Sequence, residues 1–365
     1  MFLKIRLVHA WSGLVLSLLV AVLSLSGSAL IFKDDYLRAT FPAARLGVDL
    51  SPAVVGSALE SIERQLGSQQ LSYVALAHQD MALHKIVLRD GRAAYALQTG
   101  QLIARWEENG RPEDWVFHLH HYLFMGDFGK YLAGVAALCV VLMAVSGIYL
   151  VLPFLRAFRW RLWPRSTKRR DLLGHHRDVG VVFLLPIVLI VLTGGAMVFF
   201  EQASSVLATL TMSQPTPFVQ PEAQDGDVDW PIALERTRAQ FPDAQLRLVV
   251  WPRATNSPAS IRMRLPSEWH QNGRTYAYID PLTSEVLAIR DATKLTSGER
   301  AANAIYPLHS TGIGGRPYDL LAGLTGIALS VLGLFASWSY LKLLRQRRAN
   351  ARPSDRSNDS QPSLT

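Results

Sequence analysis

Four long apolar stretches constrain the fold of this chain more than any other feature of its sequence. They run over residues 7–32, 131–153, 179–200 and 320–341, and none of them contains Asp, Glu, Lys or Arg. A helix of about 20 apolar residues crosses the hydrocarbon core of a bilayer. The first stretch is too long for the apolar part of a secretory signal, and no A-x-A cleavage motif follows it, so we expect it to be retained. The sequence therefore predicts a membrane α-helical protein with four transmembrane helices.

The basic residues predict the orientation of these helices. Lys4 and Arg6 precede the first helix, and two larger groups stand in the loop 154–178 and after residue 341. The larger groups comprise Arg156, Arg159, Arg161, Arg165, Lys168, Arg169, Arg170 and Arg177, then Lys342, Arg345, Arg347, Arg348, Arg352 and Arg356. The positive-inside rule places all three regions in the cytoplasm. The net charge of +8 is then explained by topology and by contact with anionic lipid, and nucleic-acid binding is the poorer interpretation.

This topology leaves two large soluble segments, 33–129 and 201–319, in the periplasm of a bacterial inner membrane. Each segment predicts one helix followed by strands, with helices at 57–66 and 232–241. Strand-like runs follow at 73–76, 84–88, 94–97, 245–251, 261–265 and 275–279. We therefore expect two small α+β modules, one in each half of the chain. The cytoplasmic tail, 342–365, is rich in polar residues towards its end and is predicted to be disordered.

The two halves of the chain repeat one helix–module–helix unit, and four histidines mark the repeat. His9 on the first helix and His176 before the third are each followed, at identical offsets, by a glycine and then by a Ser-Gly or Thr-Gly pair. His120 and His309 precede the second and fourth helices, each with Leu-Ala-Gly at the same distance beyond it. The sequence thus predicts a duplicated membrane unit with one histidine at each helix.

The topology sorts these four histidines into two pairs, one at each membrane surface. His9 and His176 lie at the cytoplasmic ends of their helices, and His120 and His309 lie at the periplasmic entrances of theirs. Two imidazoles from facing helices at one depth are what a six-coordinate haem needs, whereas a bare divalent metal would want more ligands. The single Cys139 excludes a Cys-zinc site. We therefore predict two b-type haems with these four histidines as axial iron ligands.

Two neighbouring histidines and four glycines extend this hypothesis. His121 and His175 do not keep the repeat spacing, but each remains a possible substitute for the ligand beside it. Gly13 and Gly180 lie four residues after the helix histidines, on nearly the same helical face, so we assign them to cofactor binding. Gly27 and Gly194 lie eighteen residues after the same histidines, about 27 Å along the axis. For this second pair, cofactor binding and close helix packing are equally good explanations.

Three histidines in the soluble segments and one proline in a span lie outside the predicted haem sites. His78, His84 and His270 fall in the soluble segments, and we expect them at the surface. Pro186 lies within the third apolar stretch and predicts a bend there, because proline removes one backbone hydrogen bond.

Several of these patterns resemble the PepSY-associated transmembrane family of iron-regulated membrane proteins, and most of all its FoxB-type siderophore reductases. The motifs are H-x-x-x-G near the start of a span, S/T-G near its end, Leu-His before the even spans, and the soluble segment Tyr276-Ala277-Tyr278-Ile279-Asp280-Pro281. The resemblance covers the four helices and both modules. It implies that the four repeat histidines bind haem and that electrons cross the membrane to ferric siderophore. The first module departs from it, with Gln98-Thr99-Gly100 in place of Asp-Pro.

The predicted function is therefore a di-haem ferric-siderophore reductase of the inner membrane, an oxidoreductase that needs no acid, base or nucleophile. No G-x-G-x-x-G motif is present, so the electron donor is a separate cytoplasmic molecule or a quinol. Aromatic residues near the second pair are either docking or anchoring residues: Trp115, Phe117, Tyr122, Phe124 and Tyr306. A general haem-based electron carrier is the main alternative. A siderophore transporter would need polar groups inside the membrane, and a purely anchoring role leaves the paired histidines without a purpose.

Overall fold

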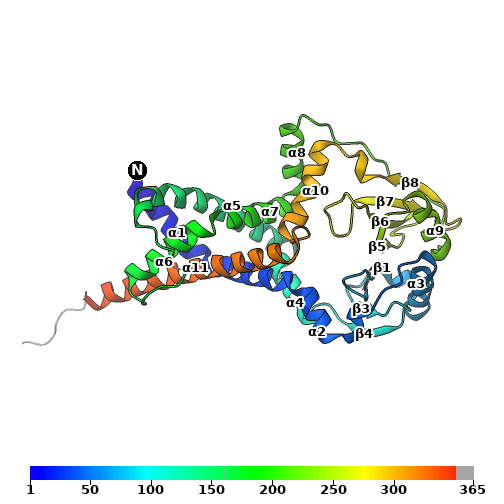
Figure 1. The fold of residues 1–365 in the computed structure, drawn as a ribbon, viewed down its shortest axis with the longest axis horizontal. Helices are drawn as coiled ribbons and strands as arrows, with labels where there is room; N and C mark the ends of the chain where they lie inside the picture. Colours follow the sequence, from blue (N-terminus) through cyan, green and yellow to red (C-terminus); the bar gives the residue numbers. More distant parts are fainter. Residues whose placement is uncertain (161, 351–365) are drawn as a thin grey trace, which may run out of the picture.

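The protein has a helical part at one end and a sheet at the other (Figure 1). This computed structural model describes residues 1–160 and 162–350. The helices are α1 (Phe2–Ile31), α2 (Lys33–Thr40), η1 (Pro42–Arg45), α3 (Pro52–Leu66), η2 (Ser68–Gln70), α4 (Pro112–Tyr122), α5 (Gly126–Val151), η3 (Leu152–Ala157), α6 (Arg169–Val182), α7 (Leu184–Val198), α8 (Phe200–Leu210), α9 (Trp230–Gln240), η4 (Ala292–Lys294), α10 (Ser297–His309) and α11 (Gly315–Asn350). The strands are β1 (Leu71–Ala75), β2 (His84–Leu88), β3 (Ala93–Ala96), β4 (Leu102–Trp106), β5 (Gln245–Val250), β6 (Ala259–Arg264), β7 (Thr275–Ile279) and β8 (Val286–Arg290).

Among the described residues, α1, α5 and α11 are long and apolar enough to cross a membrane. The pair α6 and α7 makes a fourth span if it is counted as one broken helix, bent by 71°. The break falls at Phe183, three residues before Pro186. The proline cannot donate to the carbonyl of Val182, so the helix is free to bend there. The bend expected from the sequence is therefore present.

Several helix ends differ from the predicted boundaries. α6 begins at Arg169, inside the loop predicted at 154–178, and α1 and α11 also begin earlier than predicted. α5 begins at Gly126 rather than near residue 131, because the chain turns at the preceding residues and a new helix starts at once. α11 continues to Asn350, so residues 342–350, predicted as part of a disordered tail, are helical. The helical pattern of the span simply continues through the basic residues, which are good helix formers. Arg161 and residues 351–365, with Arg352 and Arg356, lie outside the described residues.

The two soluble segments share one continuous sheet, a connection that the sequence did not predict. All eight strands join one sheet in the order β4-β3-β2-β1-β5-β6-β7-β8. The two halves meet where β1 pairs antiparallel with β5, with Val74 opposite Val249. In separate modules, β1 and β5 would each expose an unpaired strand edge, which is a liability in water. Pairing removes both edges. The outer strands β4 and β8 were not predicted.

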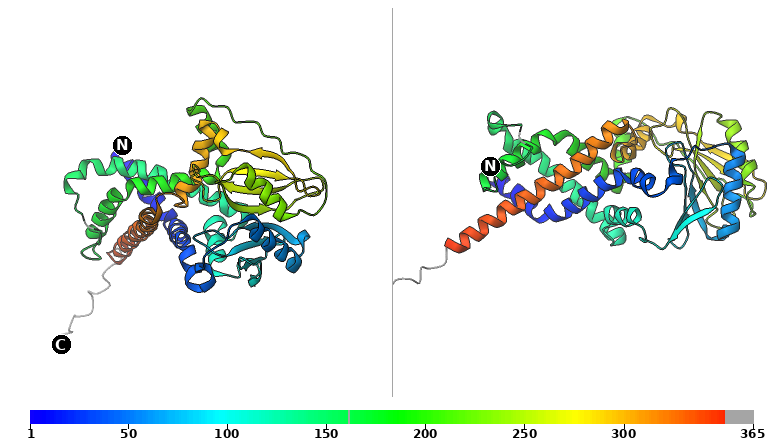
Figure 2. Two further views of the ribbon diagram at one scale, coloured as in Figure 1. Left: turned by 45° about the vertical axis from the view of Figure 1, so that its right-hand side comes forward. Right: turned by 60° about the horizontal axis from the view of Figure 1, so that its bottom comes forward.

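One hydrophobic core serves both halves of the sheet. α3 and α9 cover the face of the sheet that points away from the helical bundle (Figures 1 and 2). They approach closely, since a Cβ atom at Gly56 would lie 2.6 Å from the backbone of Pro231. The carboxylate of Glu63 on α3 accepts hydrogen bonds from the indoles of Trp230 (2.9 Å) and Trp251 (2.7 Å). The first half of the chain is thus tied to the second through partly buried hydrogen bonds.

The expectation that the sheet histidines are exposed is wrong for two of them. His84 is 2% and His270 is 6% exposed, while His78 is half-buried. The Nδ1 atom of His84 accepts a hydrogen bond from the backbone N–H of Ala77 at 3.1 Å. His270 stacks on Tyr306 with ring centroids 4.6 Å apart. Both rings are buried because each has a packing partner that the sequence pattern does not reveal.

Candidate functional site: two histidine pairs and a cavity

The first histidine pair lies in the helical bundle, at the end away from the sheet. His9 on α1 and His176 on α6 face each other with ring centroids 6.2 Å apart and ring planes at 85°. The Nδ1 atom of His9 lies 2.8 Å from Oγ of Ser146 on α5. The Nδ1 atom of His176 lies 3.2 Å from the carbonyl oxygen of Leu332 on α11. Each ring is therefore fixed through Nδ1 by a different helix.

The second pair lies at the end of the bundle that meets the sheet. His120 on α4 and His309 on α10 have ring centroids 6.1 Å apart and ring planes at 24°. The Nδ1 atom of His120 lies 2.9 Å from the carbonyl oxygen of Leu23. The Nδ1 atom of His309 lies 2.9 Å from the carbonyl oxygen of Ile190. Leu23 and Ile190 hold equivalent places in the repeat, so the duplication extends to the groups that orient the rings.

The Ser-Gly and Thr-Gly pairs of the repeat serve these same rings. A Cβ atom at Gly27 would lie 2.7 Å from Cε1 of His120, and one at Gly194 would lie 2.7 Å from Cε1 of His309. The hydroxyl of Ser26 lies 3.2 Å from Nδ1 of His120. The sequence left the role of these glycines undecided. In the structure they make room for an imidazole.

Short helices that precede the spans carry the second pair. The second span does not run straight up to its histidine, because α4 ends at Tyr122 and the chain turns through left-handed backbone at Leu123 and Phe124. His309 is the last residue of α10, and Gly314 and Gly315, both with positive φ, make the turn into α11. Glycine adopts this backbone conformation without steric cost.

The two other glycines assigned to cofactor binding differ in their surroundings. A Cβ atom at Gly13 would meet the end of the Met143 side chain at 3.1 Å, whereas one at Gly180 would meet nothing within 4 Å. Space for a flat ligand is thus open beside Gly180. Beside Gly13 it depends on one flexible methionine. Their assignment to a cofactor stays a prediction.

The possible substitute ligands make no ring contact with a histidine from the other half of the chain in the part that the structure describes. His121 stacks on Phe117 with centroids 4.0 Å apart, and its Nδ1 lies 2.9 Å from the Phe117 carbonyl oxygen. His175 is 4% exposed and packs against Phe335 and Trp163. The repeat spacing therefore selected the four histidines that the fold brings together.

In each pair, two imidazoles from different halves of the chain face each other, with ring centroids 6.2 Å and 6.1 Å apart. Two histidines are a ligand set that a b-type haem would take, so these residues could hold one at each level. The Nε2 atoms make no hydrogen bond to any described residue, so they are available as ligands. No cluster of three or more His, Cys, Asp or Glu suited to a bare metal ion occurs among the described residues.

A cavity of about 1340 Å³ extends from the second pair to the sheet. Its floor lies among apolar side chains of the bundle such as Val20 and Val140, and its roof includes Arg247 and Arg264 of the sheet. This volume exceeds the roughly 300–1,000 Å³ of a typical ligand pocket. Of the five aromatic residues predicted near the pair, Phe117, Tyr122 and Tyr306 line the cavity, and Trp115 and Phe124 do not.

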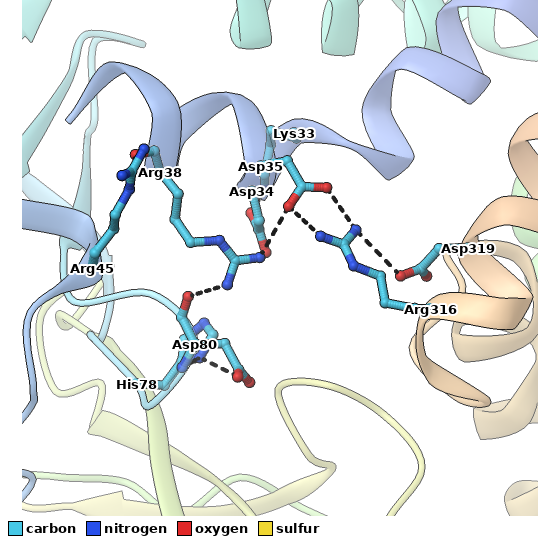
Figure 3. Close-up of polar contacts among 9 residues, drawn as sticks. All are labelled: Lys33, Asp34, Asp35, Arg38, Arg45, His78, Asp80, Arg316 and Asp319. Atoms are coloured by element: carbon cyan, nitrogen blue, oxygen red, sulfur yellow. Dashed lines mark hydrogen bonds and ion pairs between the residues drawn. The ribbon is translucent and has the colours of Figure 1, made fainter. Parts of the chain in front are cut away.

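Ion pairs at the rim of this cavity join three elements of the fold (Figure 3). Asp35 on α2 accepts hydrogen bonds from Arg38 and from both terminal nitrogens of Arg316 on α11. Arg38 also donates to the carbonyl oxygen of Asp80, at 2.9 Å, in the loop after β1. The hydrogen bond from Arg316 holds the pKa of Asp35 below its usual range. The rim carboxylates nearest the bundle therefore already have cationic partners.

Fold and site together define a membrane protein in which paired histidines stand at two levels of a helical bundle and one sheet covers one end. A family described as the PepSY-associated TM region matches residues 6–342 of the chain. The chain belongs to this family, which confirms the resemblance at the family level. A search of curated proteins finds no match.

Proposed function

We propose that this protein is a di-haem ferric-siderophore reductase of the bacterial inner membrane, the function of the FoxB-type reductases that its sequence resembles. The observation that carries the proposal is the arrangement of four imidazoles in two facing pairs, each ring fixed through Nδ1 with Nε2 left free. His9 with His176 would hold one b-type haem, and His120 with His309 would hold the other. Bound there, the two haems supply one-electron carriers at two depths of the membrane.

The groups around the histidines suit this role. The carbonyl oxygens of Leu23, Ile190 and Leu332 can accept a hydrogen bond only from a protonated Nδ1, so they set the tautomer whose lone pair is on Nε2. A hydrogen bond of this kind also orients a ligand histidine and raises its basicity. The hydroxyl of Ser146 can serve His9 in the same way. Four separate partners therefore prepare four rings for coordination.

The four spans between the two pairs contain no Asp, Glu, Lys or Arg. On α1, His9 and Gly27 are about 27 Å apart along the helix axis. Gly27 lies beside the ring of His120. A buried cluster fills part of this length: Val20, Val140, Val179, Ile187, Ala328 and Leu332. The spans therefore offer no charged group inside the membrane that could carry a solute, which supports a reductase over a transporter.

The acceptor is proposed to dock in the cavity that joins the second pair to the sheet. One electron converts Fe(III) in the docked chelate to Fe(II), and oxygen-rich chelators hold Fe(II) far less tightly. Iron is the substrate in this scheme and the protein supplies only position and environment. Because the cavity opens beside the rings of His120 and His309, the chelate can approach this pair closely.

The orientation of the protein follows from charge. The N-terminus, the basic loop before α6 and the last turns of α11 lie at the end of the bundle opposite the sheet (Figures 1 and 2). By the positive-inside rule that end is cytoplasmic. Electrons from a cytoplasmic or quinol donor would then enter at His9 and His176, and the sheet would lie in the periplasm.

Absorption spectroscopy and stopped-flow mixing test the proposal on the detergent-purified chain. We expect low-spin bis-histidine bands at two haems per chain, and reoxidation of the reduced protein by a ferric siderophore. The gallium(III) complex of the same siderophore is the control, because gallium(III) cannot accept the electron. A colourless protein from haem-replete cells would refute the haem assignment. Two haems that ferric chelates do not reoxidise would instead favour a general electron carrier.

A further inference from the structure

Arg247 occupies an unusual place in the sheet. It lies on β5 between Leu246, opposite Met263, and Leu248, opposite Arg262. Two partners on β6 that are adjacent in sequence thus face two residues on β5 with Arg247 inserted between them. Such a β-bulge redirects the side chain of the extra residue and is common beside functional sites. The bulge brings Arg247 to the wall of the cavity.

Arg247 is buried without a partner. Its side chain makes no hydrogen bond or ion pair with any residue that the structure describes, and its Nε is a buried donor without an acceptor. The residue is only 8% exposed. An unpaired buried charge is costly unless something compensates it. Burial and the nearby Arg264 lower the pKa of Arg247 to about 10, so it is still a cation at neutral pH.

Nearby charges do not pair with Arg247. The carboxylates of Asp34 and Asp80 act on it through space, but among the described residues neither makes an ion pair or hydrogen bond with it. Arg264, which follows Met263 on β6, lines the same cavity. Among the described residues, its side chain makes one hydrogen bond, from Nε to the backbone oxygen of Glu268 at 3.3 Å. The carboxylate of Glu268 is occupied by the backbone N–H groups of Leu265 and Arg274. The rim carboxylate Asp35 is matched by Arg38 and Arg316 (Figure 3). The roof of the cavity therefore keeps two cations free for a ligand.

We propose that Arg247 and Arg264 form a carboxylate-binding subsite in the cavity between the sheet and the second histidine pair. A guanidinium matches a carboxylate with two parallel hydrogen bonds, and the pairing is strongest where water is excluded. The carboxylate has two possible sources, a ferric chelate of the citrate type or the propionate groups of a haem held by His120 and His309. The first source rests on the proposed function and narrows its substrate to anionic, carboxylate-bearing chelates.

Calorimetric titration of the full-length purified protein with gallium(III) citrate tests the subsite without any redox step. Substitution Arg247→Gln removes the charge, Arg247→Lys keeps it, and Arg253→Gln changes an exposed arginine outside the cavity as the matched control. We expect Arg247→Gln to weaken binding between about tenfold and a hundredfold, as for loss of a charged hydrogen bond. Arg253→Gln should bind as the wild type does, and Arg247→Lys should lie between. The neutral gallium(III) complex of a trihydroxamate should bind equally to all four proteins.

A potentiometric titration of the same proteins separates the two sources. If the propionates are the ligand, Arg247→Gln leaves citrate binding unchanged and lowers the midpoint potential of one haem, because a nearby positive charge favours the reduced form. Arg264→Gln, a half-buried site, gives a second variant with the same expected direction should Arg247→Gln not fold. Unchanged citrate affinity together with unchanged potentials in a folded variant overturns the proposal. A haem-free protein that binds gallium citrate through Arg247 would refute the reductase and leave the subsite standing.

Discussion

A Cβ atom at Gly27 would lie 2.7 Å from Cε1 of His120, too close for the ring to stay where it is. The same distance separates a Cβ atom at Gly194 from Cε1 of His309. Both glycines stand in the repeat beside a hydroxyl residue, Ser26 or Thr193, whose oxygen lies 3.2 or 3.4 Å from Nδ1 of the same ring. The two-residue motif is therefore a socket for an imidazole from another helix.

Filling this socket should remove the haem of the second pair. In Gly27→Ala the new methyl group displaces His120, so we expect one haem per chain in place of two, or loss of the low-spin bands of one haem. Gly147→Ala is the matched control, because its Cβ atom would lie at an ordinary 3.5 Å from Cε1 of His9. Haem and protein are quantified together. Two unchanged haems in Gly27→Ala would contradict the role of the socket.

Removing single histidines should separate ligands from neighbours. His9→Ala and His309→Ala should each reduce haem content from two per chain to one, since each leaves one pair intact. His121→Ala and His175→Ala should keep both, because among the described residues neither makes a ring contact with a histidine of the other half. The measurement is again the ratio of haem to protein, with reduced-minus-oxidised spectra. If His175→Ala loses a haem and His176→Ala does not, the assignment of the first pair is wrong.

A disulfide across the seam tests the single sheet. Val74 and Val249 are register partners on β1 and β5, and partners in an antiparallel sheet have Cα atoms about 4.5–5.5 Å apart. This spacing is within reach of a disulfide. In a Cys139→Ser background, Val74→Cys with Val249→Cys should cross-link on oxidation, seen as faster migration on a non-reducing gel.

The control for this cross-link lies one strand further on. Val74→Cys with Ile261→Cys joins β1 to β6, since Ile261 is the partner of Val249. Two strand spacings are about 9.6 Å, beyond disulfide reach. No cross-link in the first pair would favour two modules without a shared sheet, and a cross-link in this control pair would contradict the observed pairing of β1 with β5.

Acid should weaken the sheet through His84. Burial lowers the pKa of His84 to about 4, and its Nδ1 accepts a hydrogen bond that a protonated ring could not accept. Because the folded pKa lies below the unfolded value near 6.5, the unfolded state binds the proton first as pH falls. The stability contributed by His84 is complete above pH 6.5 and decreases down to about pH 4. From pH 7 to 5 the loss is about 2 kcal/mol.

Thermal unfolding followed by tryptophan fluorescence measures this effect. Trp230 and Trp251 lie in the core of the sheet, so their emission reports on it. Between pH 7 and pH 5 the Tm of the wild type should fall by more than the Tm of His84→Gln, because glutamine at position 84 does not titrate. An equal fall in both proteins would assign the acid sensitivity to other groups.

Much of the membrane part could be predicted from sequence because its signals are local. A bilayer requires about 20 apolar residues for each span, so the spans are visible as composition, and Pro186 marks its bend by removing one hydrogen bond. The four histidines were selected by spacing alone, since a duplicated chain repeats the offsets of any residue with a fixed place. Equal offsets in His9 and His176 imply equivalent positions, and in the structure their rings face each other.

Long-range pairing decided the rest. Nothing in the sequence of β1 or β5 states that Val74 lies opposite Val249, because a strand edge can pair with any other edge and only the assembled bundle brings these two together. Likewise, the burial of His84 and His270 depends on partners that lie elsewhere in the fold, and that of Arg247 on a bulge between two strands. The sequence by itself determined the spans, their repeat and the histidines. The tertiary structure alone decided the single sheet, the sockets at Gly27 and Gly194, and the cavity between them and the sheet.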